Sequence, residues 1–195
     1  MEYHLKYIPP EELGRIYPRI AQDFVPEERK TEGRLYKQME EGLETGWLLM
    51  ADGKEAGYAF VLRHPAVKLA LVDYVSVYPQ GQGHGTALIT LLQNEYMEGG
   101  LLAEVESVVP GLSEEETAYR KLRQRFYRKV GFQPTAVKNE IYTVPYLVHI
   151  WSLNPMADPT ATAAKALDTL YALQLPYEEY CRNVHIEVPE EENNE

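Results

Sequence analysis

The spacing of hydrophobic and polar residues changes several times along the chain, and each change marks a short strand or helix. Residues 2–8 alternate between the two kinds and predict a first strand. Pro10-Glu11-Glu12 then marks the start of a helix that we expect to reach about Phe24, because proline and acidic residues suit a first helical turn. A second helix is predicted from Glu27 to Glu41, and Gly42 ends it.

Three strand-like segments follow this helical region, at Gly46–Ala51, Gly57–Arg63 and Lys68–Tyr78. The first two are joined by Asp52-Gly53, a strong signal for a tight β-hairpin. We therefore expect an antiparallel meander in this part of the chain, rather than a series of parallel β-α-β units.

The second half of the chain is also predicted to mix helices and strands. We first expect a helix through Leu88, Leu91, Leu92 and Tyr96 that ends at Gly99-Gly100, followed by a strand at Leu101–Val109. The next helix is predicted from Ser113 to Gly131, with Ala118, Leu122, Phe126 and Val130 on one face. After it we expect strands at Thr135–Tyr142 and Tyr146–Leu153, a helix at Thr160–Gln174, and a helical turn from Pro176 toward Arg182. These elements predict a mixed α/β (α+β) fold, in which helices flank a mostly antiparallel central sheet.

Composition and charge narrow the classes of function. The 195 residues include 30 acidic and 19 basic ones, a formal charge of −11, which argues against binding to nucleic acid or to an anionic membrane. Cys181 is the one cysteine, so a disulfide framework and a cysteine-rich zinc site are excluded. The five histidines show no metal-ligand spacing, and we expect no metal site. The first residues lack the pattern of a secretion signal, which favours a cytoplasmic location.

The charges are distributed unevenly. The last 19 residues contain seven Glu and one Arg, and we expect the tail at 187–195 to be solvated and mobile. No Lys or Arg occurs between Lys68 and Arg120, and six then occur within residues 120–129. We interpret these six as a solvated face near the end of a helix, where cations complement the helix dipole.

A glycine-rich segment, Gln80-Gly81-Gln82-Gly83-His84-Gly85-Thr86, lies between a predicted strand and a predicted helix. Backbone amide groups at such a helix start can bind an anion without any charged side chain. The segment lacks the Gly-Lys-Ser/Thr of a Walker loop, and a dinucleotide-binding fingerprint would need Gly in place of Thr86. Three interpretations of the residues stay open: an anion site, a dinucleotide site in which Glu104 or Glu106 binds the ribose, and a simple connecting turn.

This segment resembles the acyl-CoA loop of the GCN5-related N-acetyltransferase (GNAT) superfamily, Gln/Arg-x-x-Gly-x-Gly/Ala. A second segment, Phe126-Tyr127-Arg128-Lys129-Val130-Gly131-Phe132, resembles the family's Phe-Tyr-x-x-x-Gly-Phe. The chain departs from the family in having about two fewer residues before Gln80 and an insertion at 109–112 after the following strand. The resemblance implies a GNAT-like acetyltransferase domain at residues 1–153, followed by a helical extension at 154–195.

The resemblance also implies an acetyl-CoA co-substrate and residues that contact it. The pantetheine arm would lie against Val75, Ser76 and Val77, and the pyrophosphate would lie on the amide groups of residues 80–86. A part of the basic segment 120–129 could contact the 3′-phosphate. Tyr127 holds the position at which the family places a general acid that protonates the departing thiolate. The alternative is that Tyr127 is one of the chain's 15 tyrosines that simply fill a core.

For the base that deprotonates the amine, the residues favour Glu104 or Glu106. They are two positions apart on one predicted strand, so they point to the same face, where they could bind an ammonium and relay its proton. In the alternative, one of them pairs with a base of the 120–129 segment and the other faces solvent. Asp73 and Ser76 are weaker candidates.

The function expected from these observations is transfer of an acetyl group from acetyl-CoA to a primary amine by direct attack. Paired carboxylates predict a cationic acceptor, either a small molecule or a peptide amine. The alternatives are an inactive acyl-CoA-binding sensor or scaffold and, less favoured, a nicotinamide-dependent oxidoreductase. The helix at Thr160–Gln174, with Ala164, Leu167, Leu170 and Tyr171 at helical spacing, packs either on the domain or on a second subunit of a homodimer.

Overall fold

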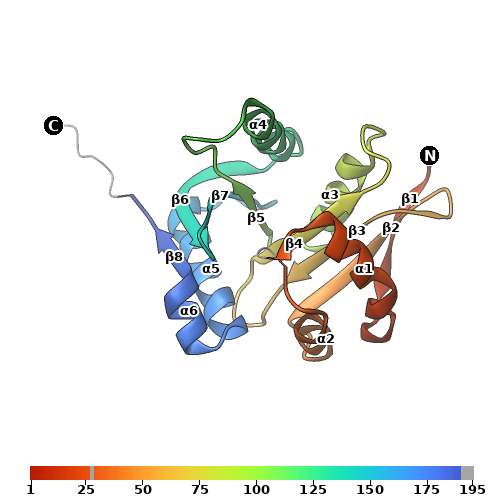
Figure 1. The fold of residues 1–195 in the computed structure, drawn as a ribbon, viewed down its shortest axis with the longest axis horizontal. Helices are drawn as coiled ribbons and strands as arrows, with labels where there is room; N and C mark the ends of the chain where they lie inside the picture. The colour runs from red at the N-terminus through yellow and green to blue at the C-terminus, as the bar shows by residue number, and fades with distance from the viewer. Residues whose placement is uncertain (27–28, 190–195) are drawn as a thin grey trace. The chain divides into compact units, whose positions relative to one another are not determined.

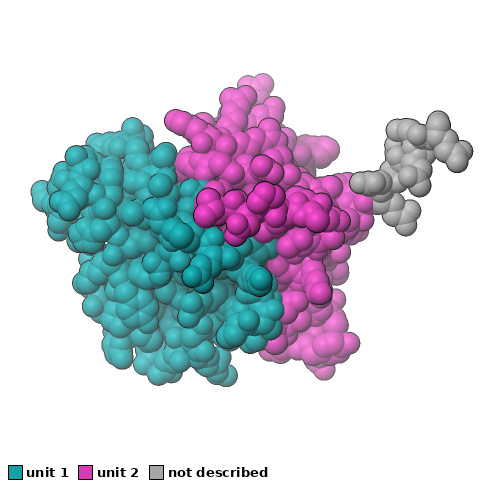
Figure 2. Space-filling view, turned by 180° about the vertical axis from the view of Figure 1, so that it is seen from behind, with its two compact units in different colours: residues 1–99 teal, residues 100–195 magenta. Residues whose placement is uncertain are grey.

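A computed structural model describes residues 1–26 and 29–189 of the chain. The described residues fall into two compact units, divided between Gly99 and Gly100 (Figure 2), and their helices and strands are labelled in Figure 1. Each unit contributes four strands in antiparallel pairs, with helices packed on them. The predicted α/β fold, with a mostly antiparallel sheet flanked by helices, is therefore confirmed.

The first unit carries its strands in the order β1-β2-β3-β4, with the bounds β1 Tyr3–Ile8, β2 Glu44–Ala51, β3 Lys54–Leu62 and β4 Ala70–Val77. All three neighbouring pairs are antiparallel, as the meander prediction requires. The β2–β3 turn is made by Asp52 and Gly53, whose φ angles of 46° and 77° are both positive, as a type I′ hairpin turn needs.

The helices of this unit are the 3₁₀ turn η1 Pro10–Glu12, α1 Leu13–Asp23, α2 Glu32–Glu40 and α3 His84–Glu95. The predicted second helix is shorter than expected. Helix α2 begins at Glu32 because Thr31 caps it, accepting a hydrogen bond from the Arg34 amide at 3.3 Å. The predicted start at Glu27 lies outside the described residues.

Helices cover both faces of these strands. Residues 56–62 of β3 are buried without interruption, whereas a strand covered on one face would alternate. One core cluster joins α1 and α2 to the strands, and its members are Ile8, Leu13, Ile16, Ile20, Leu35, Met39, Leu48, Tyr58, Phe60 and Tyr74. Helix α3 also packs on β1 to β4. Burial of this apolar surface is the main source of the unit's stability.

A buried charge cluster fixes the segment before α2 to the sheet. The Lys30 ammonium lies 2.7 Å from Glu44 Oε2 and 2.8 Å from Asp73 Oδ2, and the side chains of Lys30 and Glu44 are 8% and 0% exposed. The backbone of Lys30 also donates to the Tyr74 hydroxyl and accepts from the Tyr17 hydroxyl, both at 2.8 Å. Asp73, a weaker candidate for the base, is thus held in an ion pair.

Two carboxylates share one ammonium in this cluster, and this sets their protonation. Burial raises the pKa of Glu44 to about 8, the charge of Asp73 also raises it, and the attraction of Lys30 opposes both. The pKa of Lys30 is raised as well, because the two carboxylates outweigh the effect of its burial. At neutral pH the cluster therefore favours a protonated Glu44 beside a charged Lys30.

We expect this cluster to make folding stability depend on pH. The pKa of Glu44 in the folded protein lies above its pKa in the unfolded chain. The contribution of Glu44 to the unfolding free energy is therefore fully present at pH values below the unfolded-chain pKa, and it is lost as pH rises through about 8. Relative to Glu44→Gln, the wild type should lose up to about 1.4 kcal/mol of unfolding free energy per pH unit between pH 5.5 and 8.5. Urea denaturation at several pH values measures this difference, with the exposed Glu98→Gln as the matched control. Parallel curves for the wild type and Glu44→Gln would contradict the assignment.

The second unit carries its strands in the order β5-β7-β6-β8, again in antiparallel pairs. The strands are β5 Leu101–Glu106, β6 Gln133–Ile141, β7 Val144–Trp151 and β8 Val184–Glu187, and the helices are α4 Glu114–Lys129, α5 Pro159–Gln174 and α6 Tyr177–Asn183. Strand β5 is three residues shorter than the predicted Leu101–Val109.

The C-terminal extension, residues 154–195, corrects one prediction. It was expected to be helical, yet after α5 and α6 it adds β8, which pairs with β6 through Ile141 and Val184. A strand of four residues is too short to show a clear period in the sequence. Helix α5 packs on β6, β7 and β8, which supports packing on the chain's own sheet. Of the expected mobile tail, Glu187 lies in β8, and residues 190–195 lie outside the described residues.

None of the helices in the described ranges is both long enough and apolar enough to cross a membrane.

Candidate active site

The glycine loop connects β4 to α3 in the first unit. Its residues 79–83 are exposed, and Gly81 and Gly83 have φ angles of 81° and 84°, which favour glycine at both positions. Gly83 caps α3, and the first bond of the helix runs from the Ala87 amide to the Gly83 carbonyl at 3.0 Å. The preceding amide groups of the first turn have no partner within the helix, so they are available to an anion.

The His84 side chain belongs to the core of the first unit. It is 4% exposed, its Nδ1 lies 3.1 Å from the Tyr3 hydroxyl, and the two rings meet edge to face. This geometry gives the imidazole a packing role in the first unit. The His84 amide group still lies in the first turn of α3.

The three predicted pantetheine contacts form the end of β4. Val75, Ser76 and Val77 are half-buried and pair with residues 57–59 of β3. A Cβ atom on Gly57 would lie 2.6 Å from the Ser76 carbonyl oxygen, so only glycine allows the two strands to approach this closely. The backbone that leads into the glycine loop is therefore fixed by β3.

Tyr127 lies on α4 in the second unit and is 5% exposed. Its ring meets Phe126 and Phe132 edge to face at 5.4 and 5.3 Å between centroids, and the His149 ring lies at 6.4 Å. Burial raises the pKa of Tyr127, the charge of Arg123 lowers it, and that of Glu106 raises it. The phenol is consequently protonated at neutral pH, which is the state that a general acid requires.

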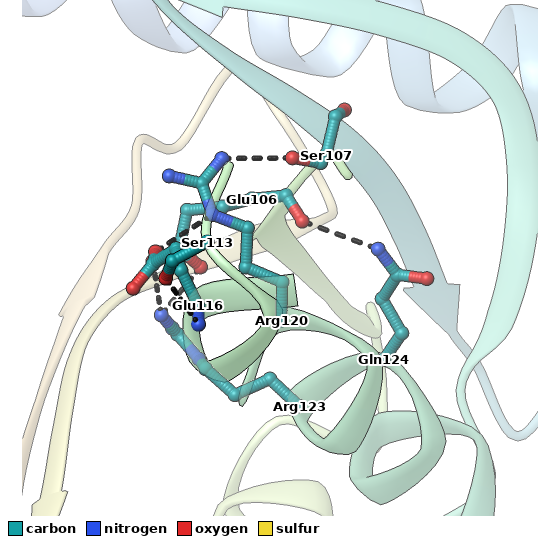
Figure 3. Close-up of polar contacts among 7 residues, drawn as sticks. All are labelled: Glu106, Ser107, Ser113, Glu116, Arg120, Arg123 and Gln124. Atoms are coloured by element: carbon teal, nitrogen blue, oxygen red, sulfur yellow. Dashed lines mark hydrogen bonds and ion pairs between the residues drawn. The ribbon is translucent and has the colours of Figure 1, made fainter. Parts of the chain in front are cut away.

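Polar contacts tie α4 to the end of β5 (Figure 3). The Arg123 guanidinium pairs with the Glu106 carboxylate, and the Gln124 amide donates to the Glu106 carbonyl oxygen at 3.2 Å. Arg120 donates to the Ser107 carbonyl oxygen at 2.8 Å. Because Tyr127 follows Arg123 by about one helical turn, these contacts also set the position of Tyr127.

The N-terminal part of α4 is held by local contacts. The Ser113 hydroxyl accepts a hydrogen bond from the Glu116 amide at 3.1 Å, as predicted for a helix cap, and Glu116 pairs with Arg120 at 2.9 Å (Figure 3). Two parts of the sequence interpretation of this helix need correction. Arg120 and Arg123 make inward contacts, whereas the other four bases are exposed as expected for a solvated face, and Leu122, expected on the apolar face, is 62% exposed.

The two candidate carboxylates of β5 have different partners. Glu106 pairs with Arg123 of α4. Glu104 instead accepts hydrogen bonds from the side-chain amide of Asn139 in β6 and from the Tyr171 hydroxyl of α5. The alternative in which one carboxylate pairs with a base of the 120–129 segment is right for Glu106. The same alternative expected the other carboxylate to face solvent. That expectation is wrong for Glu104, which is half-buried and hydrogen-bonded.

No family model and no curated protein sequence matches the chain. Solved structures of other proteins do match it. A Bacteroides thetaiotaomicron protein described as a GNAT-family acetyltransferase matches with a TM-score of 0.63 at 17% identity, over 79% of this chain and 89% of the other. The ribosomal-protein-S18-alanine N-acetyltransferase of Escherichia coli matches at 0.56 and 18% identity, over 80% and 98%. Arabidopsis thaliana NAA60, solved with acetyl-CoA, matches at 0.55 and 16% identity, over 79% and 100%.

The chain has the GNAT fold. This confirms the fold that the two sequence motifs implied. The first motif makes the junction between β4 and α3, and the second covers the end of α4 and the turn that leads into β6. The catalytic and cofactor-binding roles of the individual residues in this GNAT fold stay predictions.

Some residues of the candidate site were not assigned a polar role by sequence reasoning. Asn139 and Tyr171 hold Glu104, and His149 lies beside Tyr127, where burial lowers the pKa of its imidazole. A polar residue inside a strand was the available signal for Asn139 and His149. In α1, Arg19 lies 4.4 Å from the ring centroid of Tyr78, next to the glycine loop. Among the described residues, no group of three His, Cys, Asp or Glu side chains could hold a metal ion.

The pair between Arg123 and Glu106 should contribute to the stability of this GNAT fold. Arg123→Gln leaves a largely buried carboxylate without its guanidinium, and we expect a loss of about 1–3 kcal/mol in unfolding free energy. Chemical denaturation measures the loss, and Arg125→Gln, an exposed change on the same helix, serves as control.

The double variant Arg123→Gln/Glu106→Gln tests the reason for that loss. Removing the carboxylate as well should recover part of the stability, because no unpaired charge then remains in the protein. Equal losses in the Arg123→Gln and Arg125→Gln variants would show that the pair does not anchor α4.

Proposed function

We propose that the chain is an N-acetyltransferase that moves an acetyl group from acetyl-CoA to a primary amine. The observation that carries the proposal is the place of the two motifs in the GNAT fold: an exposed glycine loop at the start of α3, and Tyr127 in the last turns of α4. Two matched structures are described as an N-acetyltransferase and as a protein in complex with acetyl-CoA, which supports the choice of reaction and co-substrate.

In this proposal backbone groups of the glycine loop and of β4 hold the co-substrate. The amide groups around Gly81, Gly83 and Gly85 bind the pyrophosphate, and the residues 75–77 of β4 lie along the pantetheine arm. A backbone site suits this region, since no Lys or Arg occurs from residue 69 to residue 119. The positive end of the α3 dipole supplies the electrostatic attraction that a basic side chain would otherwise provide.

Glu104, Glu106 and Tyr127 are the candidates for proton transfer. A primary alkylamine has a pKa of about 10.4 and arrives as ammonium, so a proton must leave before attack. Of the two candidates we favour Glu104 as base, because Glu106 is already joined to Arg123. The amine nitrogen then forms a bond with the thioester carbonyl carbon, the carbon–sulfur bond breaks, and Tyr127 gives its proton to the departing sulfur. The bonded nitrogen releases its second surplus proton to solvent, from which Tyr127 regains the proton it gave. Glu104 keeps the proton of the ammonium until solvent removes it.

The acceptor class follows from the same carboxylate. A carboxylate favours a cationic amine, either a small molecule or the amine of a peptide. Acetylation of a ribosomal protein is the reaction named for one matched structure, which supports a peptide amine as one of the two options.

Ligand binding can be tested before any acceptor is known. Acetyl-CoA at about 100 times its dissociation constant should add about 2.7 kcal/mol to the unfolding free energy, because it binds only the folded chain. Thermal denaturation with acetyl-CoA, and with NAD as the comparison ligand, measures this effect. Stabilisation by NAD alone would overturn the proposal in favour of a nicotinamide enzyme.

Replacement of Tyr127 separates an enzyme from a binding module. Tyr127→Phe should lower kcat by roughly 10²–10⁴, because the thiolate then departs without its general acid, while binding of acetyl-CoA is retained. Turnover is measured as CoA release with polyamines, amino acids and peptide amines as acceptors. Tyr119→Phe, an exposed change on the same helix, is the matched control. Binding of acetyl-CoA with no turnover of any acceptor by the wild type would favour the sensor.

A further inference from the structure

The C-terminal extension has several attachments to the rest of the second unit that do not involve the candidate site. Strand β8 pairs with β6, and the Tyr142 amide donates to the Asn183 carbonyl oxygen at 3.0 Å. The Tyr142 hydroxyl bonds to Glu179, and the Thr160 hydroxyl accepts from the Ala136 amide at 3.2 Å. The extension is thus held along β6 by backbone and side-chain contacts.

One further contact of the extension reaches a candidate catalytic group. Tyr171 of α5 is 5% exposed, and its hydroxyl donates to Glu104 Oε2. The amide group of Asn139 donates to the other carboxylate oxygen, Oε1. Two donors from two different elements, one for each oxygen, define both the position and the plane of the Glu104 carboxylate.

The chemistry of these donors suits positioning. Both are neutral, so they orient the carboxylate without the positive charge that Arg123 places beside Glu106. Asn139 is 2% exposed, and its Oδ1 is buried with no hydrogen-bond partner among residues 1–26 and 29–189. A buried acceptor without a partner costs stability, and a network that served stability alone would satisfy both ends of this amide.

We propose that Tyr171 is a positioning residue for Glu104, so that the C-terminal extension completes the amine side of the site. The proposal rests on the proposed function, in which Glu104 takes a proton from the acceptor ammonium. A base must meet the substrate nitrogen within a narrow range of distance and angle, and a Glu side chain has three rotatable bonds that must be fixed. Tyr171 and Asn139 fix them from outside β5.

The test compares two tyrosine-to-phenylalanine changes in the extension. Tyr171→Phe removes the hydroxyl that binds Glu104, whereas Tyr180→Phe removes one that binds Asp168 of α5. We expect kcat/KM to fall roughly ten- to a hundredfold in Tyr171→Phe and to change less than twofold in Tyr180→Phe. The acid limb of the pH profile of kcat/KM should also move to higher pH in Tyr171→Phe, because loss of a donor makes the carboxylate easier to protonate.

A double-variant cycle shows whether Tyr171 acts through Glu104. In a Glu104→Gln background, Tyr171→Phe should cause little further loss of kcat/KM. Independent, multiplying losses would overturn the proposal, and so would equal effects of the two tyrosine changes.

A measurement without turnover separates this proposal from the proposed function. NMR titration of the Glu104 carboxyl carbon should show its midpoint at higher pH in Tyr171→Phe than in the wild type and in Tyr180→Phe. An unchanged midpoint would refute the positioning role even in an active enzyme. If the wild type acetylates no amine but the midpoint moves, the hydrogen bond is correct and the proposed acetyltransferase function fails.

Discussion

Strand β5 carries two carboxylates, Glu104 and Glu106, on a strand whose other residues are completely buried. A carboxylate in such a place must be paired or hydrogen-bonded, because removal of a charge from water costs several kcal/mol. The second unit is arranged so that each carboxylate has partners. Glu106 attracts Arg123 and with it helix α4, whereas Glu104 attracts Asn139 of β6 and Tyr171 of α5. The helix that bears Tyr127 and the extension are thus both tied to β5 by charge.

The first unit meets the same constraint in a different way. Glu44 and Asp73 share the ammonium of Lys30, so the cluster has one positive group for two acidic ones and favours a retained proton. The glycine loop takes its shape instead from positive φ angles, and the close approach of Gly57 to β4 fixes the strand that leads into it. Charge therefore fixes the segment before α2, and backbone geometry fixes the proposed co-substrate loop.

The sequence predicted well those features that depend on local chemistry. The Asp52-Gly53 hairpin, the Ser113 cap and the glycine junction before α3 follow from the conformations that these residues allow, and the structure has all three. Predictions failed where a partner comes from far along the chain. Apolar spacing on α4 emphasised Leu122, yet the inward contacts are made by Arg120 and Arg123, because the Glu106 carboxylate and the carbonyl oxygen just after β5 need donors.

The same reasoning explains why the candidate site was predicted only in part. Tyr127 and the loop were found because each lies in a compact motif. The partners of Glu104 could not be found this way, because Asn139 and Tyr171 are 35 and 67 residues away from it in the sequence. Tyr171 was expected only as one apolar position on a packing face, and its hydroxyl gives it a second role. Local patterns thus revealed which residues could do chemistry, and the pairing of buried charges determined which of them face one another.

The uneven charge of the chain also acquires a structural meaning. Two of the six bases within residues 120–129 are committed to acidic partners, Arg120 to Glu116 and Arg123 to Glu106. They offset acidic groups at the end of β5 and at the start of α4. The stretch without bases from residue 69 to residue 119 includes the exposed loop at the start of α3. A phosphate bound there would rely on amide dipoles, whose strength does not change with pH.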